Sequence, residues 1–258
     1  MVHSNLIFKR FGAAAKISVH SWFSNIERLS DLVFQGWQNR ARQLLLGDIL
    51  QEIWMKDSVS FWNEAAEKYA QDPIKDMESY EYKLAKTRAY FEPDMNVLEI
   101  ACGTGTTALL HAPYVASYHA VDISREMIRI ARQKEGADQI KFETADFETM
   151  SIKPESFGMV QAHSVLHLLN DPAATIRKAY SALRHGGTFV SSTACLSRIW
   201  PLRLIAPFGQ MIGKFPHMAF FSEDGLRTLM QNAGFQIVED WKPNGRFTSL
   251  FLICKKPK

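Results

Sequence analysis

The chain has 258 residues and a formal net charge of +3, and 47% of its residues are hydrophobic. This length fits one large domain, or one domain with an appendage, with enough apolar residues for a buried core. The weak positive charge does not indicate a nucleic acid as partner, and three widely spaced cysteines indicate neither a zinc site nor a disulfide framework.

Residues 1–57 are predicted to form a helical N-terminal extension. Apolar residues recur at helical spacing from Ile17 to Trp54, which predicts two or three amphipathic helices. We expect their apolar faces to pack on the main domain or to join the subunits of a homo-oligomer. The other interpretation is a targeting segment or peripheral membrane contact, because basic residues but no acidic one precede Glu27. The first predicts a cytoplasmic protein, the second a mitochondrial or membrane-peripheral one.

Two further helices are predicted before the first strand, over residues 60–71 and 77–91. Pro73 bounds the first of them, since proline is disfavoured inside a helix. Trp62 and Tyr69 lie two turns apart on one face of that helix, a spacing that by itself indicates core packing.

The stretch Val-Leu-Glu-Ile-Ala-Cys-Gly-Thr-Gly at residues 97–105 predicts a strand that runs into a tight loop and then a helix. Gly103 and Gly105 let the backbone adopt dihedral angles that a Cβ disfavours and approach a ligand closely. The helix that opens near Thr106 directs unpaired N–H groups at the same place. The sequence therefore predicts a ligand site at this turn.

Two ligand classes fit this turn. Gly103, Gly105 and Ala108 loosely match the dinucleotide fingerprint, and Asp122 lies near the distance expected for a ribose-binding acid. An NAD-linked oxidoreductase is therefore one alternative. Glu99 at the strand end disfavours it, because a carboxylate repels a diphosphate and attracts a cationic ligand.

Acidic residues end three predicted parallel strands, at Glu99, Asp122 and Asp146. The carboxyl ends of such strands form the ligand crevice of a doubly wound sheet. Asp122 is expected to accept hydrogen bonds from ribose hydroxyls, although it could instead cap the next helix, a task that Ser124 can perform. The predicted strands cover residues 97–100, 117–122, 140–145, 156–164, 188–193, 235–241 and 246–255, and the helices between them cover 106–115, 124–134, 172–183 and 223–232.

The fourth predicted strand ends in polar residues, among them His163, with His167 just beyond. Both fall where a second ligand of the crevice could lie. A histidine with a pKa near neutrality can act there as a general base. If one of these histidines acts as the base, the reaction rate should rise with pH through the neutral range. In the alternative interpretation, His163 is a buried histidine bonded to backbone and His167 packs beneath a loop.

An irregular apolar segment near residues 195–220 is predicted to form a lid. No Asp or Glu occurs between Pro172 and Ser222, while Arg198, Arg203 and Lys214 lie within the segment. This pattern suits an apolar ligand that bears an anionic group, or a membrane surface. Alternatively, the cations are simply solvated.

The motif at residues 97–105 resembles motif I of the class I S-adenosylmethionine-dependent methyltransferases. From about Phe61 onward the chain is similar to bacterial small-molecule methyltransferases of the ubiquinone/menaquinone-biosynthesis type. The resemblance implies a Rossmann-like, doubly wound seven-stranded α/β sheet whose last strand is antiparallel, with helices on both faces. It places this domain at residues 58–258. One departure is Ala101, where the family usually has glycine.

The resemblance also implies S-adenosyl-L-methionine as cofactor and suggests the roles of individual residues. Asp146 would accept from the adenine amino group, and Ile123 would pack on the adenine face. His167, and less strongly His163, are the catalytic candidates. The expected cofactor-binding residues are Tyr69, Glu99, Ala101, Cys102, Gly103, Gly105, Asp122, Ile123, Asp146, Phe147 and Ala162.

The predicted function is methyl transfer to a small, apolar molecule that can carry an anionic group. The reaction would be an in-line displacement, in which holding the reacting atoms in line supplies most of the acceleration. No metal cluster is visible in the sequence. The alternative is a non-catalytic, methyltransferase-like protein that binds the cofactor and serves as an assembly factor at a membrane.

Overall fold

The computed structural model describes residues 46–258, except 200–202, 204, 207–208, 211–214 and 244–248, and side chains from Ser58 onward. The chain divides into a unit of residues 1–52 and a unit of residues 53–258, and the second contains the sheet. The predicted N-terminal helices lie largely outside the described residues, so their role stays a prediction. Among the described residues, no helix is both long and apolar enough to cross a membrane.

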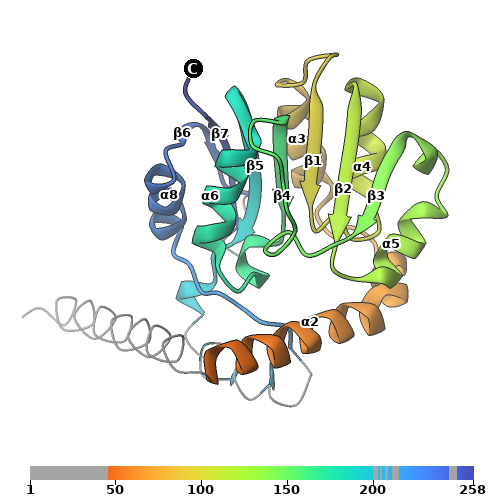
Figure 1. Ribbon diagram of the computed structural model, residues 1–258, viewed down its shortest axis with the longest axis vertical. Helices are drawn as coiled ribbons and strands as arrows, with labels where there is room; N and C mark the ends of the chain where they lie inside the picture. Colours follow the sequence, from red (N-terminus) through yellow and green to blue (C-terminus); the bar gives the residue numbers. More distant parts are fainter. Residues whose placement is uncertain (1–45, 200–202, 204, 207–208, 211–214, 244–248) are drawn as a thin grey trace, which may run out of the picture. The chain divides into compact units, whose positions relative to one another are not determined.

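The described chain builds one seven-stranded sheet in the order β3-β2-β1-β4-β5-β7-β6 (Figure 1). Strands β1 to β5 pair in parallel, while β7 runs antiparallel to both of its neighbours. The strands are β1 Asn96–Ile100, β2 Ser117–Asp122, β3 Ile140–Thr144, β4 Phe157–His163, β5 Leu183–Ala194, β6 Gln236–Trp241 and β7 Ser249–Lys255. The predicted doubly wound sheet with an antiparallel last strand is confirmed.

Helices cover both faces of the sheet, as predicted (Figure 1). On one face, α6 and α8 bury apolar side chains against β4, β5 and β7. On the other face, α4 and α5 pack on β1 to β3, and α3 lies beside α4. The α-helices are α2 Leu46–Gln71, α3 Met77–Arg88, α4 Thr106–His111, α5 Arg125–Arg132, α6 Pro172–Ala182 and α8 Glu223–Asn232.

Side-chain caps fix where several helices begin. Ser124 accepts a hydrogen bond from Met127 N at 3.1 Å, so it caps α5 as predicted. Asp171 caps α6 in the same way through Ala174 N at 2.9 Å. Ser222 caps α8 through Gly225 N at 2.9 Å. Each cap stands directly after a strand or loop and turns the chain back along the sheet.

Several predicted boundaries were wrong, among them the end of the helix predicted over 77–91, which lies at Arg88. The helix predicted from residue 60 is the end of α2, which already begins at Leu46. The helix predicted over 106–115 ends at His111 and continues as a 3₁₀ turn, because Pro113 has no N–H for an α-helical bond. Strand β5 begins at Leu183, five residues earlier than predicted. It continues through Gly186, which takes a left-handed φ of 75°, and the pairing register with β4 shifts nearby, as at a β-bulge.

Gly105 directly precedes α4, and its place in the core yields a testable prediction. A Cβ there would lie 2.7 Å from Phe142 Cζ, and the residue holds φ at 74°. Gly105→Ala should therefore lower the free energy of unfolding by about 1–3 kcal/mol, measured by urea denaturation. Gly103→Ala is the matched control, because its φ is also left-handed but its nearest neighbour, Tyr69, would lie 3.6 Å away. Equal losses in the two variants would contradict the packing argument.

Candidate functional site

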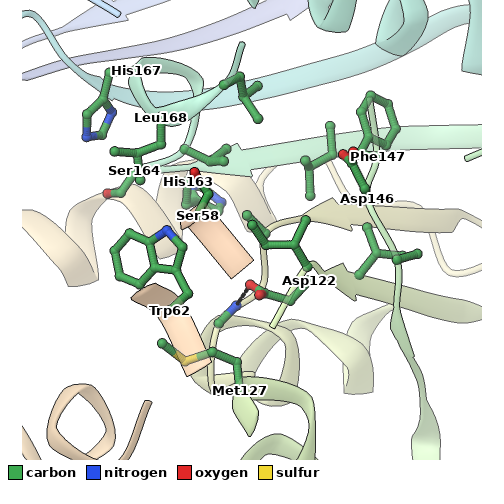
Figure 2. A pocket seen from close by; sticks show the side chains of 18 of the residues that line it. Ser58, Trp62, Asp122, Met127, Asp146, Phe147, His163, Ser164, His167 and Leu168 are labelled. Atoms are coloured by element: carbon green, nitrogen blue, oxygen red, sulfur yellow. Dashed lines mark hydrogen bonds between the residues drawn. The ribbon is translucent and has the colours of Figure 1, made fainter. Parts of the chain in front are cut away.

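Two adjoining cavities open where the parallel strands end. The first has a volume of about 330 Å³ and the second about 650 Å³. They share five lining residues, Tyr69, Ala101, Gly103, His163 and Ser164. Figure 2 shows the first cavity, with Asp146 and Phe147 at one end and Ser164 and His167 at the other. The predicted crevice is thus present as two connected chambers around the glycine loop.

The loop after β1 is held by the carboxylate that ends β2. Gly103 N donates to Asp122 Oδ2 and Ser124 N donates to Asp122 Oδ1, each at 2.8 Å. Ala101 and Gly103 both adopt left-handed φ angles, 53° and 55°. Asp122 is buried, which raises the pKa of its carboxyl, and it faces the first cavity. Each of its oxygens retains a lone pair for a ligand.

Glu99 is almost fully buried on β1 and lines the second cavity rather than the first. Tyr118 on β2 donates a hydrogen bond to Glu99 Oε2 at 2.8 Å. Burial raises the pKa of Glu99 to about 8, outweighing the Tyr118 hydrogen bond, which lowers it. A cationic group placed beside Glu99 would favour its ionised form, so this carboxyl is suited to an ammonium ligand.

The far end of the first cavity combines an acid with apolar surfaces. Asp146 Oδ1 accepts a hydrogen bond from Glu148 N at 2.8 Å, and Phe147 beside it is buried. Ile123 and Met127 line the same cavity, and Figure 2 shows Met127 among the lining side chains. This arrangement of one polar group and several apolar side chains suits a flat, aromatic ligand group.

The last turns of α2 border both cavities. Trp62 lines the first cavity, and its ring meets that of Tyr69 edge to face at a centroid distance of 6.3 Å. Asn63 Oδ1 accepts a hydrogen bond from Ser124 Oγ at 2.8 Å, which fastens α2 to the start of α5. The spacing of Trp62 and Tyr69 predicted core packing. This prediction was incomplete, because the Trp62 ring also lines the cavity.

His163 belongs to a polar network on β4. Gln161 Oε1 accepts from His163 Nε2 at 2.9 Å and from His111 Nδ1 at 3.1 Å. Burial, together with the nearby His111 and Lys83 charges, lowers the pKa of His163 to about 3. His163 is therefore neutral at neutral pH. The alternative interpretation in the sequence analysis gave it a backbone hydrogen-bond partner, whereas its partner in the structure is the Gln161 side chain.

His167 lies in the 3₁₀ turn Leu166–Leu168 and lines the first cavity. Its Nδ1 is buried and has no hydrogen-bond partner among the described residues. Burial lowers the pKa of His167 to about 4. The prediction of a histidine that titrates near neutrality was wrong, because burial removes the solvation that stabilises the charged ring.

Residues 72–240 match the family model described as "Methyltransferase domain". The chain belongs to this family of S-adenosylmethionine-dependent methyltransferases. Among its relatives, the malonyl-[acyl-carrier protein] O-methyltransferase of Priestia megaterium is 29% identical over 56% of this chain and 55% of that protein. The ubiquinone biosynthesis O-methyltransferase of Xanthomonas campestris is 32% identical over 39% of this chain and 44% of that protein.

The fold of this methyltransferase recurs in solved structures. The YcgJ protein of Bacillus subtilis aligns with a TM-score of 0.58 at 15% identity, over 69% of this chain and 99% of that one. The chain spans about half the length of the curated relatives that it matches. The resemblance deduced from the motif at residues 97–105 is confirmed, and so is S-adenosylmethionine as the cofactor of the family.

The residues present fit this cofactor. The buried carboxyls of Glu99 and Asp122 suit a ligand that carries an ammonium and a sulfonium and no phosphate. Of the expected cofactor-binding residues in the methyltransferase, these line one or both cavities: Tyr69, Glu99, Ala101, Cys102, Gly103, Asp122, Ile123, Asp146 and Phe147. Their individual roles stay predictions.

Two expected cofactor-binding residues do not line either cavity. A Cβ on Gly105 would meet Phe142 in the core. Ala162 is fully buried among the residues that α6 and α8 cover. Cofactor binding by these two residues therefore stays a prediction.

The predicted lid is only partly described. Ala219 N donates to the His167 carbonyl at 2.7 Å, and the Arg203 guanidinium lies 5.6 Å from the Phe220 ring centre. None of the described residues between 195 and 220 lines either cavity. The side chains of Arg198 and Lys214 lie outside the described residues, so the lid stays a prediction.

Proposed function

We propose that the protein transfers a methyl group from S-adenosylmethionine to a small molecule whose nucleophile lies beside Ser164 and His167. The observation that carries this proposal is the pair of connected cavities around the Gly103 loop, each lined by a buried carboxyl. One holds Asp122 and Asp146, and the other holds Glu99. The bound cofactor supplies a methyl carbon activated by the sulfonium.

The chain itself contributes to catalysis mainly by positioning the cofactor and the acceptor. Asp122 and Glu99 fix the two ends of the cofactor, Trp62 and Tyr69 from α2 exclude water, and the acceptor is held in line with the methyl group. The His167 ring, which lines the first cavity, takes up the proton of an acceptor hydroxyl. The two O-methyltransferases described above support an oxygen nucleophile.

Calorimetry tests the proposal. S-adenosylmethionine and S-adenosylhomocysteine should bind, and NAD should not, because the loop faces carboxyls rather than phosphate-binding cations. Mass spectrometry should then detect a product that is one methyl heavier after incubation with small phenols, quinols or fatty acids. Binding of the cofactor without turnover of any acceptor would favour the non-catalytic alternative, and binding of NAD alone would refute the proposal.

A further inference from the structure

The second cavity contains a cation that the cofactor-binding motif does not use. Lys83 lies on α3, whose cavity-facing side also carries Asp76, Ser79, Tyr80 and Leu84. The Lys83 side chain is half-buried, and its Nζ donates to Ser192 Oγ on β5 at 3.3 Å. Among the described residues Lys83 forms no ion pair, and its hydrogen-bond partner is neutral.

The cation and the acid of this cavity lie at different ends. Glu99 is on β1 and Ser192 on β5, with β4 between them. Neighbouring strands are about 4.8 Å apart, which places the two ends roughly 10 Å apart. Tyr118 and Asp122 are the groups that act on Glu99, whereas Lys83 acts on His163. Glu99 therefore marks one end of the cavity, the acidic end, and Lys83 marks the other, the basic end, where Asp76 also lies.

The acidic end accounts for the methionine part of the cofactor. Its ammonium is suited to Glu99, and its carboxylate is attached to the same carbon, so it stays near that end. The basic end is left for another ligand. His163 and Ser164 border both cavities, so a molecule at Lys83 can reach the place where the acceptor nucleophile is proposed to lie.

We propose that the Lys83 end of the second cavity binds a carboxylate of the methyl acceptor. This proposal rests on the proposed function. Burial lowers the pKa of Lys83, so the ammonium is under-solvated without a partner, and a bound carboxylate restores that solvation. Asp76, the acid that acts on Lys83, is exposed and already accepts a hydrogen bond from Ser79 N at 3.0 Å. The site therefore selects acceptors with an anionic group.

Binding measured on the protein saturated with S-adenosylhomocysteine tests the inference. Straight-chain carboxylates from acetate to octanoate, and benzoate, are titrated by calorimetry beside their neutral amides. At least one carboxylate should bind ten times or more tightly than its amide. Lys83→Met should abolish that preference, and Lys83→Arg should retain part of it. Lys86→Met is the matched control, because Lys86 is on the same helix but pairs with Glu239 outside the cavity.

The outcomes separate this inference from the proposed function. Equal binding of acids and amides, or a preference that survives in Lys83→Met with an unchanged melting temperature, would overturn the carboxylate site alone. A loss of S-adenosylhomocysteine affinity in Lys83→Met, without loss for methylthioadenosine, which lacks the amino-acid tail, would assign the cation to the cofactor and overturn it too. Failure of the unaltered protein to bind either cofactor form would instead refute the proposed function.

Discussion

His167→Ala should lower the turnover number about 100-fold, or about 2.7 kcal/mol in activation free energy. The imidazole lines the first cavity, so it is placed to take up a proton from the acceptor. Cofactor affinity should barely change, because we expect Glu99, Asp122 and Asp146 to bind the cofactor. Initial rates at saturating acceptor, with calorimetry of S-adenosylmethionine, measure both quantities.

The pH dependence follows from the burial of the ring. Since the pKa of His167 is lowered to about 4, the imidazole is neutral above that value and becomes protonated below it. This group therefore leaves the rate flat through the neutral range, and the rate falls as pH drops through about 4. The His167→Ala variant should not show this fall in rate at acidic pH.

Two further variants keep the prediction testable. His167→Gln preserves polar groups but cannot take up a proton, so it should be as slow as His167→Ala. His163→Ala should reduce the melting temperature more than the rate, because His163 donates to Gln161 in a buried network. Near-full turnover of His167→Ala would leave proximity alone as the source of catalysis. Loss of cofactor binding and stability together would show that His167 is structural.

Asp122→Ala should weaken S-adenosylmethionine binding about 10- to 100-fold, corresponding to about 1–3 kcal/mol. The substitution removes the expected ribose acceptor and also leaves Gly103 N and Ser124 N without their shared partner. Isothermal titration calorimetry measures the affinity, and urea denaturation measures the accompanying loss of stability.

Asp122→Asn removes the charge without shortening the side chain. Its single oxygen can accept from only one of the two backbone N–H groups, while its amide N–H₂ faces the other, so the loop should still be perturbed. Asp138→Ala, an exposed acid in the turn before β3, is the charge-matched control and should leave affinity unchanged. Unchanged affinity in Asp122→Ala would remove Asp122 from the cofactor site.

Most of the sheet was predictable because its strands are largely apolar and are bounded by residues with a local physical role. Ser124 caps its helix through a local hydrogen bond, and the acids near the ends of β1, β2 and β3 stand out against apolar strands. The crevice rule then brings Glu99, Asp122 and Asp146 to one edge. Local chemistry and topology together therefore specified the site.

The remaining features depend on tertiary packing. A lysine on a charged helix is expected to be solvated, so nothing in the sequence distinguishes Lys83, which faces the cavity, from Lys86, which pairs with Glu239. The environment of Gly105 depends on Phe142, which lies far away in the chain. The pKa of His167 depends on how deeply its turn is buried. Spacing along the chain carries none of this information.

The place of β7 within the sheet has a consequence for the order of synthesis and folding. This strand separates β5 from β6, and the residues from Leu250 to Cys254 are at most 1% exposed. While the ribosome is still making the chain, β1 to β5 can already pair, but the side of β5 that receives β7 stays open until Lys255 has emerged. An open strand edge can pair with other nascent chains. The sheet is therefore completed only after β1 to β5 have been made, and until then the edge of β5 is open to pairing with other chains.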